Sequence, residues 1–224
     1  MVRYHNHAFW IYGVIVALAI REALSTVIPH TIPLLAQNQI ASQPEPKNQL
    51  MLEAIRLVLF LAMTIRFYLG SCRYFDQVYC ADDSKLKFPR ANYSMDFVLG
   101  LLHFLLFFTW SETLITHDRL RHGLSGFLLI MGMILGFDVF WLLLSWGYDT
   151  RTMIGRWAFV NAITLLVAIV IALVTNYWQL CGERTAEVFT GIPVGLTTLV
   201  DFGEMFGGNN ILTDWISNIF PPQS

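Results

Sequence analysis

Residues 124–146 read LSGFLLIMGMILGFDVFWLLLSW, a stretch in which Asp138 is the one charged residue. A helix needs about 20 mostly apolar residues to cross the hydrocarbon core of a bilayer. The apolar segment that contains this stretch, 124–147, meets that requirement, and so do three others, at about 51–70, 95–116 and 157–178. Residues 51–178 are therefore predicted to form a core of four transmembrane helices.

The composition of the whole chain supports a membrane protein. Of its 224 residues, 55% are hydrophobic and 13% are charged, whereas a soluble domain usually has about 25% charged residues. So few charges argue against a soluble enzyme, and a net charge of −2 gives no electrostatic reason to expect a nucleic-acid partner. We expect an all-α, polytopic integral membrane bundle of four or five transmembrane helices that self-associates into a homo-oligomer in a plasma or inner membrane.

The two ends of the chain are less regular than the core. Residues 1–36 are mostly apolar but contain Arg21, Glu22 and two prolines. We predict one long helix, loosened toward Pro29, with the two charges near mid-membrane; a helix that ends near residue 20, followed by an interfacial piece, is the alternative. Residues 37–50 are predicted to form a polar linker. Residues 179–224 are predicted to form a cap or an interfacial segment, and a re-entrant loop there would need protein around its backbone.

Lys and Arg counts predict the orientation, because cytoplasmic loops are enriched in both. With five spans, one side holds seven of these residues, Arg3, Arg73, Lys85, Lys87, Arg90, Arg151 and Arg156. The other side holds four, Lys47, Arg119, Arg121 and Arg184. This difference predicts a cytoplasmic N-terminus.

Polar residues inside the predicted spans fall into two layers. The inner layer contains Arg66, Asp96, Asp138 and Asn161, with His103 close to it, and the outer layer contains Glu53, Arg56 and Glu112. Ionisable residues at bilayer depth cost several kcal/mol unless they are paired or hydrated, so each is a candidate functional residue. Arg66 has two carboxylates, Asp96 and Asp138, at compatible depth on other helices. A register-fixing ion-pair network and a hydrated cavity both explain such a layer.

A basic loop follows the second predicted span. Arg73, Lys85, Lys87 and Arg90 lie in it, and aromatic residues alternate with arginine from Arg66 to Asp76. Ordinary positive-inside anchoring with an aromatic belt explains such a segment. The alternative is a surface that binds anionic headgroups, a phosphate-bearing ligand or a soluble protein partner.

Several kinds of site are not predicted. Gly123, Ser125 and Gly126 resemble the serine motif of rhomboid-type intramembrane proteases over four residues, but all six histidines precede Ser125, so the later histidine of that dyad is missing. No C-x-x-C or H-E-x-x-H motif occurs. We expect neither a metal nor a cofactor.

Two classes of function remain. The first is a homo-oligomeric ion or proton channel, or a small transporter, whose path passes the inner layer. The second is a non-enzymatic membrane subunit, meaning an anchor, sensor or membrane-perturbing effector of the kind used in stress or phage defence, which acts with a soluble partner at the basic loop. A membrane-embedded lipid enzyme is a weaker third class, because Asp82 and Asp83 alone do not make a paired-carboxylate metal motif.

Overall fold

The computed structural model describes residues 2–36, 44–80, 92–115, 126–145, 153–178, 189 and 191–199. Throughout these ranges the regular structure is helical, without strands, as predicted. The elements in chain order are α1 (Val2–Ala36), α2 (Pro44–Phe75), the π-helical turn η2 (Asp76–Cys80), α4 (Tyr93–Glu112), α5 (Gly126–Ser145) and α6 (Met153–Trp178). A short helix at 191–199 follows.

Three of these helices are long and apolar enough to cross a membrane. The segments are Trp10–Ile32 in α1, Tyr93–Glu112 in α4 and Gly126–Leu144 in α5. In α6 the apolar stretch among the described side chains is shorter, Trp157–Ile171. Helix α2 has 32 residues, but Glu53, Arg56 and Arg66 interrupt its apolar character. The chain is thus compatible with a membrane protein, while the total of four or five spans stays a prediction.

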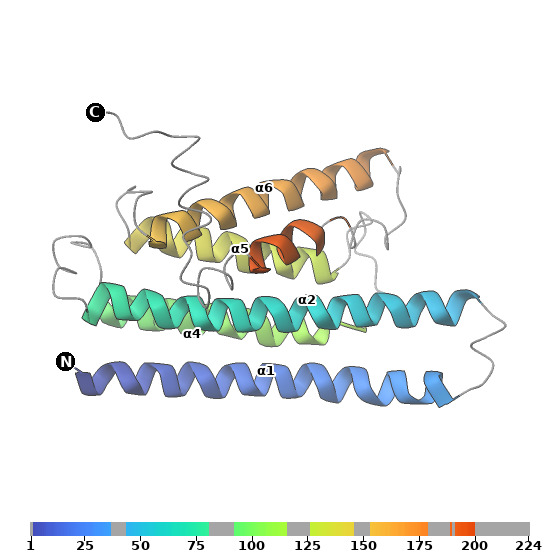
Figure 1. Cartoon of the computed structure of the whole chain (residues 1–224), viewed down its shortest axis with the longest axis horizontal. Helices are drawn as coiled ribbons and strands as arrows, with labels where there is room; N and C mark the ends of the chain where they lie inside the picture. Colours follow the sequence, from blue (N-terminus) through green and yellow to red (C-terminus); the bar gives the residue numbers. More distant parts are fainter. Residues whose placement is uncertain are drawn as a thin grey trace.

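The long helices run side by side along one direction (Figure 1). Helix α1 packs against α4 and α2, α4 packs against α5, and α5 packs against α6. Helix α1 lies at one edge of the bundle in this view. Aromatic rings fill the centre, and Phe60, Phe67, Phe104, Phe107 and Trp110 are completely buried there.

Two helix boundaries refine the predicted organisation. Helix α1 continues through Pro29 and Pro33 to Ala36, so the N-terminal segment is one helix and the alternative end near residue 20 does not hold. Helix α2 begins at Pro44, inside the predicted linker. Proline favours the first position of a helix, where its missing N–H has no intrahelical acceptor anyway.

A close approach joins α1 to α4. Tyr12 Oη donates a hydrogen bond of 2.9 Å to the backbone oxygen of Phe97. Gly100 makes room for the phenol, because a Cβ on residue 100 would overlap it. Helix α4 therefore needs glycine at this position in order to pack against α1.

The short helix at 191–199 lies against the middle of the predicted span of α2. A Cβ on Gly191 would come within 3.0 Å of the Leu59 side chain. Val194 is buried, whereas Ile192, Leu196 and Leu199 are exposed. One face of this short helix is therefore buried, while its other face is apolar and exposed.

Candidate functional site: buried polar side chains at one end of the bundle

Three polar side chains of the predicted inner layer meet in one bridge. Arg66 Nη2 donates to Asn161 Oδ1 at 2.6 Å, and Asn161 Nδ2 donates to Asp138 Oδ2 at 2.5 Å. These residues come from α2, α6 and α5, and their exposed fractions are 0%, 0% and 2%. Asn161 therefore links the buried cation to a buried carboxylate. We call this group the polar bridge.

Asp96 has a different set of partners. Its Oδ2 accepts hydrogen bonds from the phenols of Tyr74 (2.6 Å) and Tyr79 (2.5 Å), and its Oδ1 accepts one from Trp141 Nε1 at 2.9 Å. The donors come from α2, η2 and α5, so one carboxylate on α4 connects three other elements. Three donors compensate much of the cost of burying a carboxylate.

Tyr79 lies on η2, beyond the predicted end of the second span. Burial raises the pKa of its phenol well above the usual range, and the hydrogen bond to Asp96 raises it further. The phenol therefore stays protonated and keeps donating to Asp96 at any physiological pH. Tyr79 is partly exposed, while Asp96 is 1% exposed. Tyr79 is thus the contact between the buried carboxylate and the surface at this end.

His103 is completely buried among aromatic rings. Its ring centroid lies 5.0 Å from that of Phe67, 5.6 Å from those of Phe107 and Phe137, and 6.2 Å from that of Trp141. The rings, rather than the carboxylates of the layer, form its immediate surroundings. Trp141 contacts both His103 and Asp96, and so joins the histidine to the polar layer.

The predicted outer layer is brought together only in part. Glu53 and Arg56 are completely buried on α2. Glu53 Oε2 lies 3.1 Å from His30 Nδ1 on α1, and Arg56 Nη1 donates to the backbone oxygen of Leu114 at 3.4 Å. Glu112 is exposed at the end of α4. Glu53 and Arg56 thus contact α1 and the C-terminal end of the α4 segment, while Glu112 lies at the surface.

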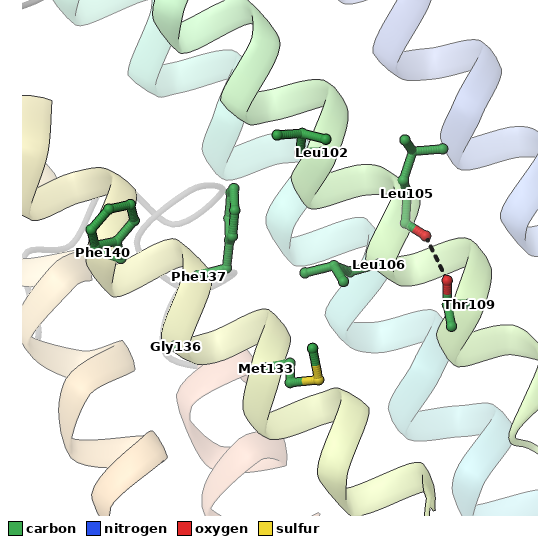
Figure 2. A pocket seen from close by; sticks show the side chains of 8 residues that line it. All are labelled: Leu102, Leu105, Leu106, Thr109, Met133, Gly136, Phe137 and Phe140. Carbon is green, nitrogen blue, oxygen red and sulfur yellow. Dashed lines mark hydrogen bonds between the residues drawn. The ribbon is translucent and has the colours of Figure 1, made fainter.

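An apolar groove lies between α4 and α5 (Figure 2). Its volume is about 500 Å³, and it is lined by Leu102, Leu105, Leu106, Thr109, Met133, Gly136, Phe137 and Phe140. The Thr109 hydroxyl donates to the Leu105 backbone oxygen, so the lining is almost wholly apolar. Phe137 stacks on His103 with 18° between the ring planes, and therefore separates this groove from the histidine.

Of the four residues predicted to bind an anionic ligand or a soluble partner, the structure describes only the first, Arg73. Arg73 is partly exposed at the end of α2. Lys85, Lys87 and Arg90 lie outside the described residues. Within the described ranges, no group of three or more His, Cys, Asp and Glu side chains could hold a metal ion.

Four residues with clear polar roles were not predicted: Tyr74, Tyr79, Trp141 and His30. The alternation of arginine and aromatic residues near Arg66 was the signal for Tyr74. That pattern predicts positive-inside anchoring or a lipid-headgroup or phosphate surface, whereas Tyr74 points to Asp96 inside the bundle. The spacing of Asp138 and Trp141, three residues apart on α5, was a second signal, since such residues share a helix face.

Comparison of the chain with protein-family models, with curated proteins and with solved structures finds no match.

Proposed function

We propose that the protein translocates protons or small ions across a membrane, as a channel or small transporter, and that Asp138 handles the transported charge. One observation carries this proposal: the polar bridge of Arg66, Asn161 and Asp138 joins three helices with at most 2% exposure. Ionisable residues buried at bilayer depth are expensive, and they commonly belong to ion or proton pathways.

The place of Asp138 in the chain supports its role. It is the single charged residue of α5, which is one of the three helices able to span a membrane. Gain of a proton or a cation at Asp138 would change the charge of the bridge. Because Asn161 and Arg66 sit on α6 and α2, that change would alter the packing of three helices together. Such coupling is what a gated path requires.

Asp96 supplies a second carboxylate toward the inner surface. The partly exposed phenol of Tyr79 is hydrogen-bonded to it, and Trp141 connects it to α5, three residues from Asp138. In the proposed path a proton or cation would reach Asp96 beside Tyr79 and then pass along α5 to Asp138.

Flux through liposomes tests the proposal. Purified protein is reconstituted, and proton and cation flux is compared for the wild type and Asp138→Asn, which removes the charge and keeps the size. Asp76→Asn is the matched control, because Asp76 is an exposed carboxylate on η2. We expect Asp138→Asn to lower the flux at least about tenfold or to change ion preference, with Asp76→Asn equal to wild type. Equal flux in Asp138→Asn, or none from correctly inserted wild type, contradicts the proposal.

A non-enzymatic membrane subunit is the second candidate. It is favoured by the tight burial of the polar bridge, which also suits a network that only fixes helix register. In that case Asp138→Asn and Asn161→Leu would both lower the thermal stability of the bundle, and the wild type would show no flux. Charge reversal of Lys85, Lys87 and Arg90 would then abolish capture of a soluble partner.

A further inference from the structure

One face of α1 carries exposed residues with the spacing of a helix–helix seam. Successive positions are three and four residues apart in turn, which is the heptad spacing of helices that pack side by side in a coiled coil. The exposed residues are Ile11, Val14, Leu18, Arg21, Ser25, Ile28 and Ile32. Their apolar members are between 42% and 58% exposed. We call this row the α1 seam.

Another face of α1 packs into the bundle. Tyr12, Val16, Ala19, Ala23 and Val27 are buried in the core of the bundle, where α1 packs against α4 and α2. The α1 seam therefore faces away from the described helices, at the edge of the bundle seen in Figure 1.

A charge sits at the centre of this seam. Arg21 is the midpoint of the segment Trp10–Ile32, which is able to span a membrane, with eleven residues on either side. At 1.5 Å per residue, its Cα lies about 16 Å from each end of the segment. An arginine side chain is too short to cover that distance. Bare lipid around Arg21 would thus leave a guanidinium in hydrocarbon, at a cost of several kcal/mol.

The carboxylate of Glu22, the next residue, has the opposite charge to Arg21, but the two side chains of one chain do not pair. In the described part of the chain, neither the Arg21 guanidinium nor the Glu22 carboxylate takes part in a hydrogen bond or an ion pair. Adjacent residues on a helix point about 100° apart, so they do not face each other. Glu22 is partly exposed on the flank of the seam.

We propose that the α1 seam binds the α1 seam of a second copy of this chain, with Arg21 of each copy paired to Glu22 of the other. In a parallel pair, each seam residue packs into a hole formed by four residues of the facing helix. Consider a seam residue at the second core position of the heptad. The hole that receives it includes the partner residue that comes directly after the equivalent position, so the hole for Arg21 would include Glu22 of the other copy. Arg21 occupies that position if Leu18 occupies the first.

Two-fold symmetry makes this pairing reciprocal, because residue i meets residue j and j meets i. Arg21 and Glu22 differ in depth by about 1.5 Å, so two parallel copies bring them together at one level. The seam is therefore self-complementary in charge as well as in the spacing of its exposed residues, which is why it fits a second copy. The dimer does not depend on transport, and it would form equally in a non-conducting subunit.

A charge swap tests the pairing in the full-length protein. Dimerisation is measured in lipid nanodiscs and in detergent by mass photometry for Arg21→Glu, Glu22→Arg and the double variant. Each single variant places like charges opposite one another, so dimer affinity should fall at least about tenfold. The double variant restores opposite charges and should return to within about threefold of wild type. No loss in the single variants, or no recovery in the double variant, overturns the pairing.

Disulfide cross-linking provides a second test of the α1–α1 dimer, which still applies if a charge variant fails to insert into the membrane. In a background with Cys72, Cys80 and Cys181 replaced by serine, Leu18→Cys and Ser25→Cys should form interchain disulfides under mild oxidation in membranes. Leu166→Cys is the control, because Leu166 is 61% exposed on α6, away from the seam. Cross-linking at Leu166 without cross-linking at the seam, a monomeric wild type, or a different protein bound at the seam overturns the proposal.

Discussion

The indole nitrogen of Trp141 on α5 donates a hydrogen bond of 2.9 Å to Asp96 Oδ1 on α4. Both side chains are almost completely buried, with exposed fractions of 2% and 1%. The same indole lies 5.3 Å from the ring of Tyr74 and 6.2 Å from that of His103. Trp141 therefore connects α5, the helix that carries Asp138, to both Asp96 and His103 on α4.

Trp141→Phe should destabilise the bundle because it removes a hydrogen-bond donor to Asp96 and keeps an aromatic ring. A hydrogen bond to a charged group contributes about 1.5–3 kcal/mol. Trp157→Phe is the matched control, since the buried indole nitrogen of Trp157 makes no hydrogen bond within the described residues. We expect Trp141→Phe to lower the free energy of unfolding by about 1–3 kcal/mol more than Trp157→Phe. Thermal and denaturant unfolding in detergent measures this difference, and equal losses in the two variants would contradict the role of the bond.

Gly100→Ala should also destabilise the bundle, because the added methyl group would overlap the Tyr12 phenol. Tyr12 is completely buried and bonded to the Phe97 backbone, so it could make room only by giving up that bond. Overpacking of this kind typically costs about 1–3 kcal/mol. Gly132→Ala is the control, since nothing lies within 4 Å of a Cβ at that position; there alanine should be neutral or stabilising by up to about 1 kcal/mol.

A double-variant cycle identifies the cause of the Gly100 effect. Tyr12→Phe removes the hydroxyl that the new methyl group would meet first. If the overlap is responsible, Gly100→Ala should cost less in the Tyr12→Phe background than in wild type, a non-additivity expected of residues in contact. Additive losses would show that Gly100 matters for another reason.

The depth of the buried polar residues could be predicted from the sequence, while most of their partners could not. Counting along each span placed Arg66, Asp138 and Asn161 at one level, and they do meet. Asp96 was placed at a depth compatible with Arg66, but its hydrogen bonds with Tyr74, Tyr79 and Trp141 were not predicted. Depth follows from helix rise alone, whereas a partner also depends on how each helix is rotated. A helix that is apolar on every side gives no amphipathic pattern from which to read that rotation.

The helix boundaries in the N-terminal part of the chain could be predicted only in part. A continuous apolar run with two charges predicted one long helix, and α1 is continuous through both prolines. The polar composition of residues 37–50 predicted a polar linker outside the membrane, and α2 begins inside it, at Pro44. Polar residues are compatible with the first turns of a helix that extends beyond the membrane, so composition alone could not fix that boundary.

Cys72 should react slowly with thiol reagents at neutral pH. It is a free cysteine and is partly buried near the end of α2, beyond the predicted span. Burial raises the pKa of its thiol to about 11, although a hydrogen bond with Tyr68 works in the opposite direction. The thiolate is the reactive form, so a raised pKa means a smaller reactive fraction at any pH below it.

In a variant with Cys80 and Cys181 replaced by serine, the rate of labelling by iodoacetamide should keep rising about tenfold per pH unit from 7.5 to 9.5, whereas an ordinary thiol with a pKa near 8.5 would level off. Tyr68→Phe removes the bond that favours the thiolate and should slow labelling further at each pH. A plateau below pH 9, or faster labelling in Tyr68→Phe, would contradict this account of the Cys72 environment.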